Sequence, residues 1–370
     1  MVNEILLKVL EKINSYGFES YLVGGFPRDF YLGKESIDYD ICTNATPKQL
    51  KEIFGESMIP QEQYGSVTLI LNDYRFEITT YRHDIKYLNN RKPVEIEYID
   101  NLLDDLKRRD FTMNTMCIDS KGNLIDLLNG KDDINNKIIR TVGDADYKIF
   151  EDSLRILRAI RFATTLHFEL SPDLKNAIIK HKDLLKKLSY YRKKEELDKI
   201  FSSPNVMYGI SLIKDLGLDE PLELSKIDSV VPTTYLIGIW AQLDCLDKYI
   251  FNRVERESII AINELMNKDI LDYNNLYKYG LYITTIVGEI KGIDSSLINE
   301  KYDSLYIKNK TDINIDAMEV CNILKRKPGK YLKNIFNDIE YKLVNKIIEN
   351  DKESIKKYII DNYSNNDYIF

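Results

Sequence analysis

The spacing of apolar residues divides the chain into two parts near Asn129. Before this point strand-like and helix-like patterns mix: residues 20–23 form a short β-prone run, and residues 66–71 and 75–80 predict a hairpin. Beyond it, nearly every apolar pattern has a helical period. The sequence therefore predicts an α+β fold, in which a head with a mixed sheet and flanking helices precedes an all-α remainder.

Further elements of the head can be located from their end signals and faces. Residues 1–16 combine regularly spaced apolar positions with two glutamates, which predicts an amphipathic helix and no signal peptide. Thr46 followed by Pro47 predicts the start of a helix that ends near Gly55. Residues 117–127 predict a second hairpin around a Lys-Gly turn.

The composition indicates a protein with a large core. Of the 370 residues, 44% are hydrophobic and 30% charged, which is enough for more than one domain, and no apolar run is long enough to span a bilayer. The four cysteines lack Cys-x-x-Cys spacing, which favours a reducing compartment, and hence the cytoplasm, over structural zinc or disulfides. The net charge of −7 does not exclude a nucleic-acid partner, because affinity for phosphates depends on local basic surface.

A glycine pair after the first strand is followed by two aspartates on the next. Gly24 and Gly25 let the backbone approach a phosphate closely. Asp38 and Asp40 alternate with apolar residues from Ile37 onward, so a strand here would present both carboxylates on one face. Each signal alone is weak, since Gly-Gly usually marks a turn and Asp-x-Asp a solvated strand. In this order they predict nucleotidyl transfer, because magnesium ions would neutralise the carboxylates and activate an attacking hydroxyl.

A basic pair forms the second cluster. Arg108 and Arg109 precede Asp110, and Asn114 follows four residues later. The guanidinium groups would bind triphosphate oxygens, while the carboxylate and the amide would hydrogen-bond a ribose or order the turn. The same residues also fit a solvated basic helix end with a capping aspartate, so their meaning depends on the other clusters.

A run of arginines forms the third cluster. Asp152, Arg155, Arg158 and Arg161 follow at intervals of three, which would align them along one face of an otherwise apolar helix. A merely solvated face more often mixes lysine with glutamate, so the arginines favour a binding role. The pair at 152 and 155 matches the amine and the ring nitrogen that cytosine and adenine share, whereas guanine and uracil present the reverse. One protein pair would thus accept CTP and ATP and reject GTP and UTP.

Together these clusters resemble the motifs of the bacterial class II tRNA nucleotidyltransferases, the CCA-adding enzymes and their poly(A) polymerase relatives. The motifs that carry the resemblance are residues 22–29 with 38–40, 108–114 and 151–155, with the neck helix at 194–200 and a tail segment at 327–332. Residues 219–307 are weakly recognisable. The resemblance implies a nucleotidyltransferase head at 1–137, a base-recognising neck at 138–202, a body at 203–300 and a tRNA-binding tail at 301–370.

The resemblance also implies residue roles. Asp38 and Asp40 would be the ligands of two magnesium ions, and Glu77 on a later strand would be a third catalytic carboxylate that deprotonates the tRNA 3′-hydroxyl. The implied nucleotide contacts are Gly24, Gly25, Arg28, Arg109, Asp110, Asn114, Asp152, Arg155, Arg158 and Arg161.

The activity implied is template-independent addition of CCA to the tRNA 3′ end from CTP and ATP, with release of pyrophosphate. Residues 81–93 stand where this family has a flexible loop linked to the final A addition, which argues against an enzyme that adds only CC. An A-adding enzyme and a poly(A) polymerase remain alternatives, and a non-catalytic RNA-binding protein on the same scaffold is a more distant one. The basic segments expected to face tRNA phosphates are 180–187, 192–194 and 325–327 with Lys330 and Lys333.

Overall fold

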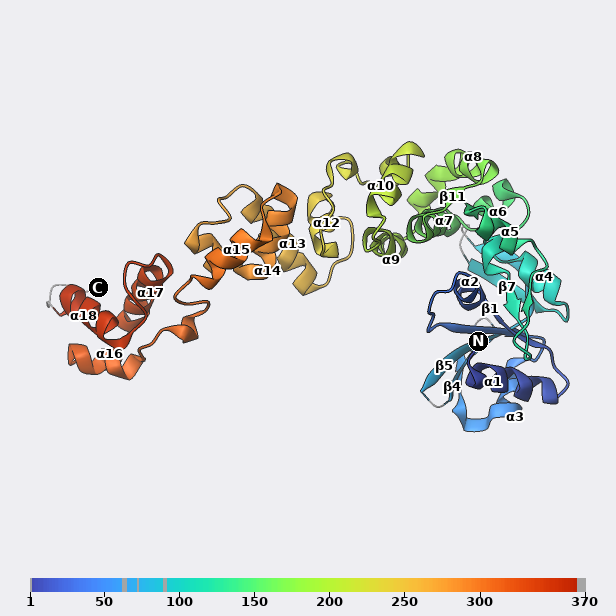
Figure 1. Ribbon diagram of the computed structural model, residues 1–370, viewed down its shortest axis with the longest axis horizontal. Coiled ribbons are helices and arrows are strands. Elements are labelled where there is room, and N and C mark those ends of the chain that lie inside the picture. Colours follow the sequence, from blue (N-terminus) through green and yellow to red (C-terminus); the bar gives the residue numbers. More distant parts are fainter. Residues whose placement is uncertain (1, 62–64, 72, 89–91, 365–370) are drawn as a thin grey trace. The chain divides into compact units, whose positions relative to one another are not determined.

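A computed structural model describes residues 2–61, 65–71, 73–88 and 92–364. The chain forms two compact units, Met1–Glu223 and Leu224–Phe370 (Figure 1). Among the described residues, no helix has both the length and the apolar content that crossing a bilayer requires.

The described strands of the N-terminal unit build one mixed sheet, one separate hairpin and one short parallel pair. In the sheet, the second and fifth strands run parallel and the other neighbours antiparallel, which confirms the predicted fold class. Both predicted hairpins are present in it. Its strands, in spatial order, are β3 (Met58–Gln61), β4 (Ser66–Leu71), β5 (Tyr74–Thr80), β2 (Tyr39–Thr43), β1 (Ser20–Val23), β8 (Cys117–Ile118) and β9 (Leu124–Ile125). The separate hairpin, β6 (Arg82–Leu88) with β7 (Lys92–Tyr98), occupies most of the predicted flexible segment, of which residues 89–91 lie outside the described part.

The alternation of residues along β2 gives the sheet two different faces. Ile41 packs with Leu22 in an apolar core that also takes in the buried sides of α1 (Glu4–Ser15) and α3 (Pro47–Phe54), which cover this face (Figure 1). Because neighbouring strand residues point to opposite sides, Asp40 faces away from this core.

Helices make up the rest of the N-terminal unit. α3 begins where the sequence predicts it, because the side chains of Thr46 and Gln49 form a capping box. After Asn129 the described chain of this unit is helical apart from one parallel pair, β10 (Ile138–Ile139) with β11 (Glu169–Leu170). The other helices are α2 (Gly25–Tyr31), the 3-10 helix η1 (Gly55–Ser57), α4 (Leu102–Lys107), the 3-10 helix η3 (Thr112–Asn114), α5 (Gly130–Asn135), α6 (Ala145–Glu151), α7 (Leu154–Leu166), α8 (Pro172–His181), the 3-10 helix η4 (Lys182–Lys187), α9 (Tyr190–Phe201), α10 (Val206–Asp215) and α11 (Asp219–Leu222).

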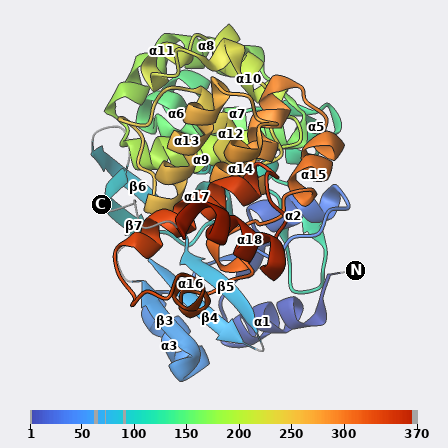
Figure 2. The same cartoon turned by 90° about the vertical axis from the view of Figure 1, so that its left-hand side faces the viewer.

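The described regular elements of the C-terminal unit are all helices. Its last three are α16 (Ala317–Leu324), α17 (Tyr331–Val344) and α18 (Lys352–Tyr363) (Figure 2). They bury an apolar cluster that includes Ile339 and Ile355. The long helix α14 is interrupted at Gly280, whose φ is 71°. The other α-helices are α12 (Leu236–Gln242), α13 (Arg253–Met266), α14 (Tyr273–Lys291) and α15 (Ser295–Asp303).

The strand that carries the acidic pair is shorter than predicted. Pairing with β5 begins at Tyr39, so Ile37 does not alternate into the sheet and is instead 90% exposed. Asp38 precedes the strand and is exposed, whereas Asp40 lies within it. The two carboxylates therefore come from a strand and from the segment that leads into it.

One of the predicted basic segments does not face solvent as a whole. Lys193 is only 2% exposed, and its Nζ lies 3.4 Å from the Pro221 carbonyl oxygen and 4.6 Å from the centre of the Tyr190 ring. Lys194 is paired with Asp198 at 2.9 Å. The prediction that residues 192–194 meet tRNA phosphates is therefore wrong for Lys193, because the amphipathic packing of α9 buries it.

Candidate active site

The turn between β1 and α2 brings backbone close to an acidic side chain. Gly24 has a φ of 79°, and a Cβ at this position would lie 2.9 Å from Oδ2 of Asp40. Any larger residue would therefore be strained and would displace the carboxylate. Within the first turns of α2, Arg28 donates to Asp29 at 2.9 Å and to Oδ1 of Asn114 at 2.8 Å, so its guanidinium is held in one orientation.

The carboxylates of Asp38 and Asp40 lie beside this turn, and the nearby arginines do not fully balance their negative charge. Burial, followed by the charge of Asp38, raises the pKa of Asp40 to about 6, although Arg109 opposes the shift. Glu77 lies opposite Asp40 in the β2–β5 ladder and raises the same pKa further. A pair of crowded carboxylates is what a hard divalent cation stabilises, so Asp38 and Asp40 fit such an ion. In the described chain no group of three or more acidic, Cys or His side chains is placed to hold a metal, so other ligands would come from substrate or water.

A buried aspartate organises the basic pair at the end of α4. Asp105 is fully buried and accepts from Arg108 at 2.8 Å and from Arg109 at 3.2 Å. It also accepts from the backbone amide of Arg82 at 3.3 Å, where the β6–β7 hairpin begins. Burial acts against the charged form of Asp105, yet the two arginines hold its pKa below the usual range. The basic pair is thus fixed from behind before any substrate arrives.

Asp110 has one of the two roles that the sequence predicts, since it orders the turn. Its carboxylate accepts from Nε and Nη2 of Arg158 at 2.8 and 2.6 Å and from the side-chain amide of Asn114 at 3.1 Å. Burial opposes ionisation, but these donors keep the pKa of Asp110 well below its usual range. The side chain therefore orders the turn through Asn114 and orients Arg158, and a hydrogen bond to a ribose, the other predicted role, would have to compete with these contacts.

One aromatic ring gathers three guanidinium groups. The ring centre of Phe162 on α7 lies 4.2 Å from Arg161, 5.1 Å from Arg28 and 5.5 Å from Arg158, measured to the guanidinium carbon. Arg161 is also 3.3 Å from the Glu196 carboxylate of α9. Cation–π contacts and ion pairs together hold like charges near one another, which prepares the site for a polyanion.

The predicted stripe of Asp152, Arg155, Arg158 and Arg161 forms on α7 for its three arginines but does not include Asp152. Asp152 lies in the break between α6 and α7, with φ −139° and ψ 102°, and accepts from the Leu154 amide at 3.0 Å. Arg155 is 6% exposed and donates to Glu151 at 2.5 Å and to the Lys148 carbonyl at 2.7 Å. Both residues line the same cavity, but several of the arginine's donors already serve the protein.

Most of these groups border one cavity of about 560 Å³ in the N-terminal unit, whereas Asp29, Asp105 and Glu196 contact its arginines without lining it. The predicted site residues come together there from the sheet and from α7, except Glu77, which is half exposed and ion-paired with Arg75. Arg108, predicted with Arg109 to bind triphosphate oxygens, also lines the cavity, and three further lining residues were not predicted as site residues. The full lining consists of Gly24, Gly25, Arg28, Asp38, Asp40, Arg82, Arg108, Arg109, Asp110, Asn114, Asp152, Arg155, Arg158, Arg161, Phe162 and Lys199.

Two of the three missed residues had partial signals in the sequence. Phe162 directly follows the last arginine of the third cluster, and Lys199 lies one helical turn beyond Glu196 on the neck-like helix. Arg82 has no local signal, because only the backbone bond to Asp105 and the start of the hairpin bring it to the cavity.

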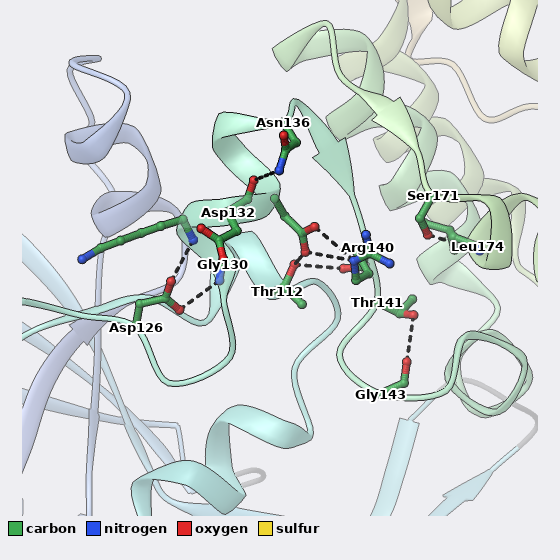
Figure 3. A network of polar contacts seen from close by, with 12 residues as sticks. Thr112, Asp126, Gly130, Asp132, Asn136, Arg140, Thr141, Gly143, Ser171 and Leu174 are labelled. Atoms are coloured by element: carbon green, nitrogen blue, oxygen red, sulfur yellow. Dashed lines mark hydrogen bonds and ion pairs between the residues drawn. The ribbon is translucent and has the colours of Figure 1, made fainter.

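A polar network supports η3 from outside the cavity (Figure 3). The Thr112 hydroxyl donates to Asp133 at 2.6 Å, and Asp133 accepts from Nε of Arg140 at 3.0 Å. Gly130 starts α5 directly beneath this turn, and a Cβ there would lie 2.5 Å from the Thr112 carbonyl oxygen. The network therefore fixes the turn that carries Asn114.

The close approach at Gly130 predicts a stability effect. Gly130→Ala should lower the free energy of unfolding by about 1–3 kcal/mol, because backbone must move to admit the methyl group. Urea unfolding followed by circular dichroism measures this, with Lys131→Ala as the neighbouring control, expected within about 0.5 kcal/mol of wild type. An unchanged midpoint for Gly130→Ala would show that α5 does not press on η3.

Comparisons with known proteins agree along the whole chain. A family model described as "Poly A polymerase head domain" matches residues 20–140, one described as "Probable RNA and SrmB- binding site of polymerase A" matches 167–226, and one described as "tRNA nucleotidyltransferase domain 2 putative" matches 246–359. The chain is 31% identical to a CCA-adding enzyme of Oceanobacillus iheyensis, covering 98% of this chain and 99% of that protein. It is 32% identical to one of Lactobacillus johnsonii, covering 96% and 97%.

Solved structures show the same architecture. The Bacillus stearothermophilus CCA-adding enzyme in complex with CTP superposes with a TM-score of 0.84 at 26% identity, covering 98% of both chains. The Thermotoga maritima CCA-adding enzyme complexed with tRNA superposes with a TM-score of 0.70 at 20% identity, covering 96% of this chain and 94% of that one. The second match shows a common fold.

Proposed function

Since this chain belongs to the CCA-adding enzyme family of nucleotidyltransferases, we propose that it adds CCA to the 3′ end of tRNA from CTP and ATP without a nucleic-acid template. The observation that carries the proposal is the shared cavity, in which the acidic pair of the head meets the arginines of α7. An acidic pair suited to a divalent ion, facing arginines suited to a triphosphate, supports transfer chemistry over mere RNA binding.

The arginines of the cavity would bind the triphosphate. Arg28, Arg109 and Arg158 are each held by a carboxylate, Asp29, Asp105 or Asp110. Because these partners orient the guanidinium groups in advance, binding would cost little side-chain entropy and would place the α-phosphorus reproducibly. The same carboxylates would weaken the net attraction, so affinity would be moderate and product release would stay fast.

The carboxylates would organise the reacting end. Asp38 and Asp40 would hold divalent metal, which the family generally uses and which, when bound, neutralises phosphate charge and promotes ionisation of the 3′-hydroxyl. In-line attack of that hydroxyl on the α-phosphorus would form the new phosphodiester and release pyrophosphate. Glu77, opposite Asp40, remains the proposed acceptor of the hydroxyl proton.

Asp152 would be the main reader of the base. Its carboxylate can accept from the exocyclic amine that cytosine and adenine share. Arg155 would donate to the ring nitrogen only with donors not already engaged by Glu151 and the Lys148 carbonyl. The structure thus supports an unequal pair, in which the aspartate carries more of the selection than the sequence alone suggests.

The rest of the chain would serve the tRNA. We propose a neck at 138–202, a body at 203–300 and a tail at 301–370, with exposed lysines at 325–333 facing RNA phosphates. All four cysteines are buried and free of disulfide bonds, which supports the proposal that the protein acts in the reducing cytoplasm.

One incubation tests the activity and separates the alternatives. Purified protein is given tRNA that lacks CCA, or tRNA that ends in CC, with labelled CTP or ATP. Incorporation of two C residues and one A supports the proposal. Addition of A alone to the CC-ended tRNA would indicate an A-adding enzyme, and a long A tail a poly(A) polymerase. No incorporation with magnesium or manganese would favour a non-catalytic RNA-binding protein.

A further inference from the structure

Two lysines in the C-terminal unit converge on one tyrosine ring. Nζ of Lys301, from α15, lies 4.4 Å from the ring centre of Tyr273, and Nζ of Lys346, just after α17, lies 4.7 Å from it. Lys346 also lies 5.6 Å from the ring centre of Tyr306. Three segments that are far apart in the sequence thus place two ammonium groups around one ring. This ring packs against the apolar cluster that includes Ile339 and Ile355. We call Tyr273, Lys301 and Lys346 the Tyr273 cluster.

Among the residues that the structure describes, no carboxylate balances the charge of the Tyr273 cluster. Within the described residues, neither ammonium group has an acidic oxygen within 4.0 Å. Asp272 is adjacent in sequence, but its carboxylate accepts from the amides of Asn274 and Asn275 and so caps α14. Hydrogen bonds between the Tyr273 phenol and the side chains of Lys346, Ser304 and Lys301, in decreasing order of effect, lower the pKa of Tyr273. The cluster therefore carries excess positive charge at a fixed position.

A second tyrosine of the same unit provides an internal contrast. Lys268 and Lys278 lie 5.1 and 4.6 Å from the ring centre of Tyr279 and donate to its hydroxyl at 2.6 and 3.0 Å. There, however, Glu264 accepts the Tyr279 hydroxyl proton at 2.9 Å and pairs with Lys278 at 3.3 Å. The two clusters share a pair of lysines on one ring and differ in the carboxylate. Among the described residues, only the lysine pair at Tyr279 has a carboxylate beside it, and Glu264 offsets one of its two positive charges.

We propose that the Tyr273 cluster is a phosphate-binding site, in which Lys301 and Lys346 bracket one phosphate group. Two ammonium groups on the same ring repel each other, and a phosphate that contacts both would remove the repulsion and supply acceptors. If the proposed function holds, the phosphate belongs to the backbone of the bound tRNA; free inorganic phosphate has the same chemistry. The contact carries no sequence information, so it would position the RNA without reading it.

Salt-dependent tRNA binding tests the site in the full-length protein. The double variant Lys301→Gln/Lys346→Gln should bind tRNA lacking CCA about five- to tenfold more weakly, and its slope of log affinity against log salt should be smaller by about 1. The matched variant Lys268→Gln/Lys278→Gln removes the same formal charge and should change affinity less than twofold with an unchanged slope. Equal effects of both variants would overturn the proposal, because net charge alone would explain them.

Lysine footprinting locates the contact and its source. Acetylation with a water-soluble ester, read by mass spectrometry, should be slowed at Lys301 and Lys346 by micromolar tRNA but not at Lys268 and Lys278. Equal protection by inorganic phosphate at the same phosphate concentration would identify a free-phosphate site, and no protection by either would overturn the proposal.

Steady-state kinetics distinguish this site from the proposed function. The Lys301→Gln/Lys346→Gln variant should raise KM for tRNA with kcat within twofold of wild type, and equal urea midpoints would show that it is folded. If wild type incorporates no nucleotide, the proposed function fails whatever the footprint shows. If wild type is active but the variant has the same KM for tRNA, the Tyr273 cluster does not contact the tRNA backbone, and the proposed function stands.

Discussion

Asp40→Asn is expected to lower kcat for CTP and ATP incorporation by about a thousandfold or more while leaving tRNA affinity within twofold. The substitution keeps the size of the side chain but removes the charge that a divalent ion needs at this position. Loss of several kcal/mol of charge stabilisation in the transition state corresponds to a rate effect of about this size. Single-turnover incorporation with saturating tRNA measures it without interference from product release.

The control lies on the same sheet. Asp73 is exposed in the turn after β4, with a φ of 65° that asparagine adopts as readily as aspartate, and it does not line the cavity. Asp73→Asn should therefore keep wild-type kcat. Asp40→Asn should unfold at no lower urea concentration than wild type, because it removes a buried charge beside Asp38. Retained turnover in folded Asp40→Asn would contradict the metal assignment.

Much of the fold followed from local patterns. The capping box at Thr46, the alternation along β2 and the helical periods beyond Asn129 each depend on residues close in sequence, and the structure shows the elements that they predict. The start of β2 was misplaced because Ile37 continues the alternating pattern while the ladder begins only at Tyr39.

The site was predictable as a set of residues and less so as a set of contacts. The sequence predicted that Asp110 and Arg158 lie in the same site but did not show that they bind each other. Their hydrogen bond joins the segment before η3 to α7, and the two residues are 48 positions apart in the sequence. Asp105 gave no signal, since its importance comes from complete burial between Arg108, Arg109 and the Arg82 amide. Partners that neutralise a binding arginine depend on tertiary packing, which periodicity does not report.

Asp152→Asn is expected to relax nucleotide choice more than any other single substitution in the cavity. The amide keeps an oxygen for the Leu154 bond but can present N–H groups to the carbonyl oxygen of uracil or guanine. Because an unmatched buried polar group costs about 1–3 kcal/mol, the ratio of kcat/KM for CTP over UTP should fall roughly tenfold to a hundredfold. Competition between labelled CTP and UTP on tRNA lacking CCA gives this ratio directly.

The structure makes Asp152 a better test of selection than Arg155. Changing Arg155 would leave Glu151 and the Lys148 carbonyl without their buried donor, so lost activity would not separate misfolding from misreading. The pKa of Asp152 is raised by burial even though Arg155 opposes the shift, so its carboxylate is not saturated by partners and an amide should replace it at little cost in stability. Asp146 lies on α6, the helix that Asp152 follows, but it does not line this cavity. Asp146→Asn should therefore keep the wild-type ratio of kcat/KM for CTP over UTP. If Asp152→Asn keeps that ratio too, selection between bases must come from the shape of the cavity and not from the hydrogen bonds of this residue.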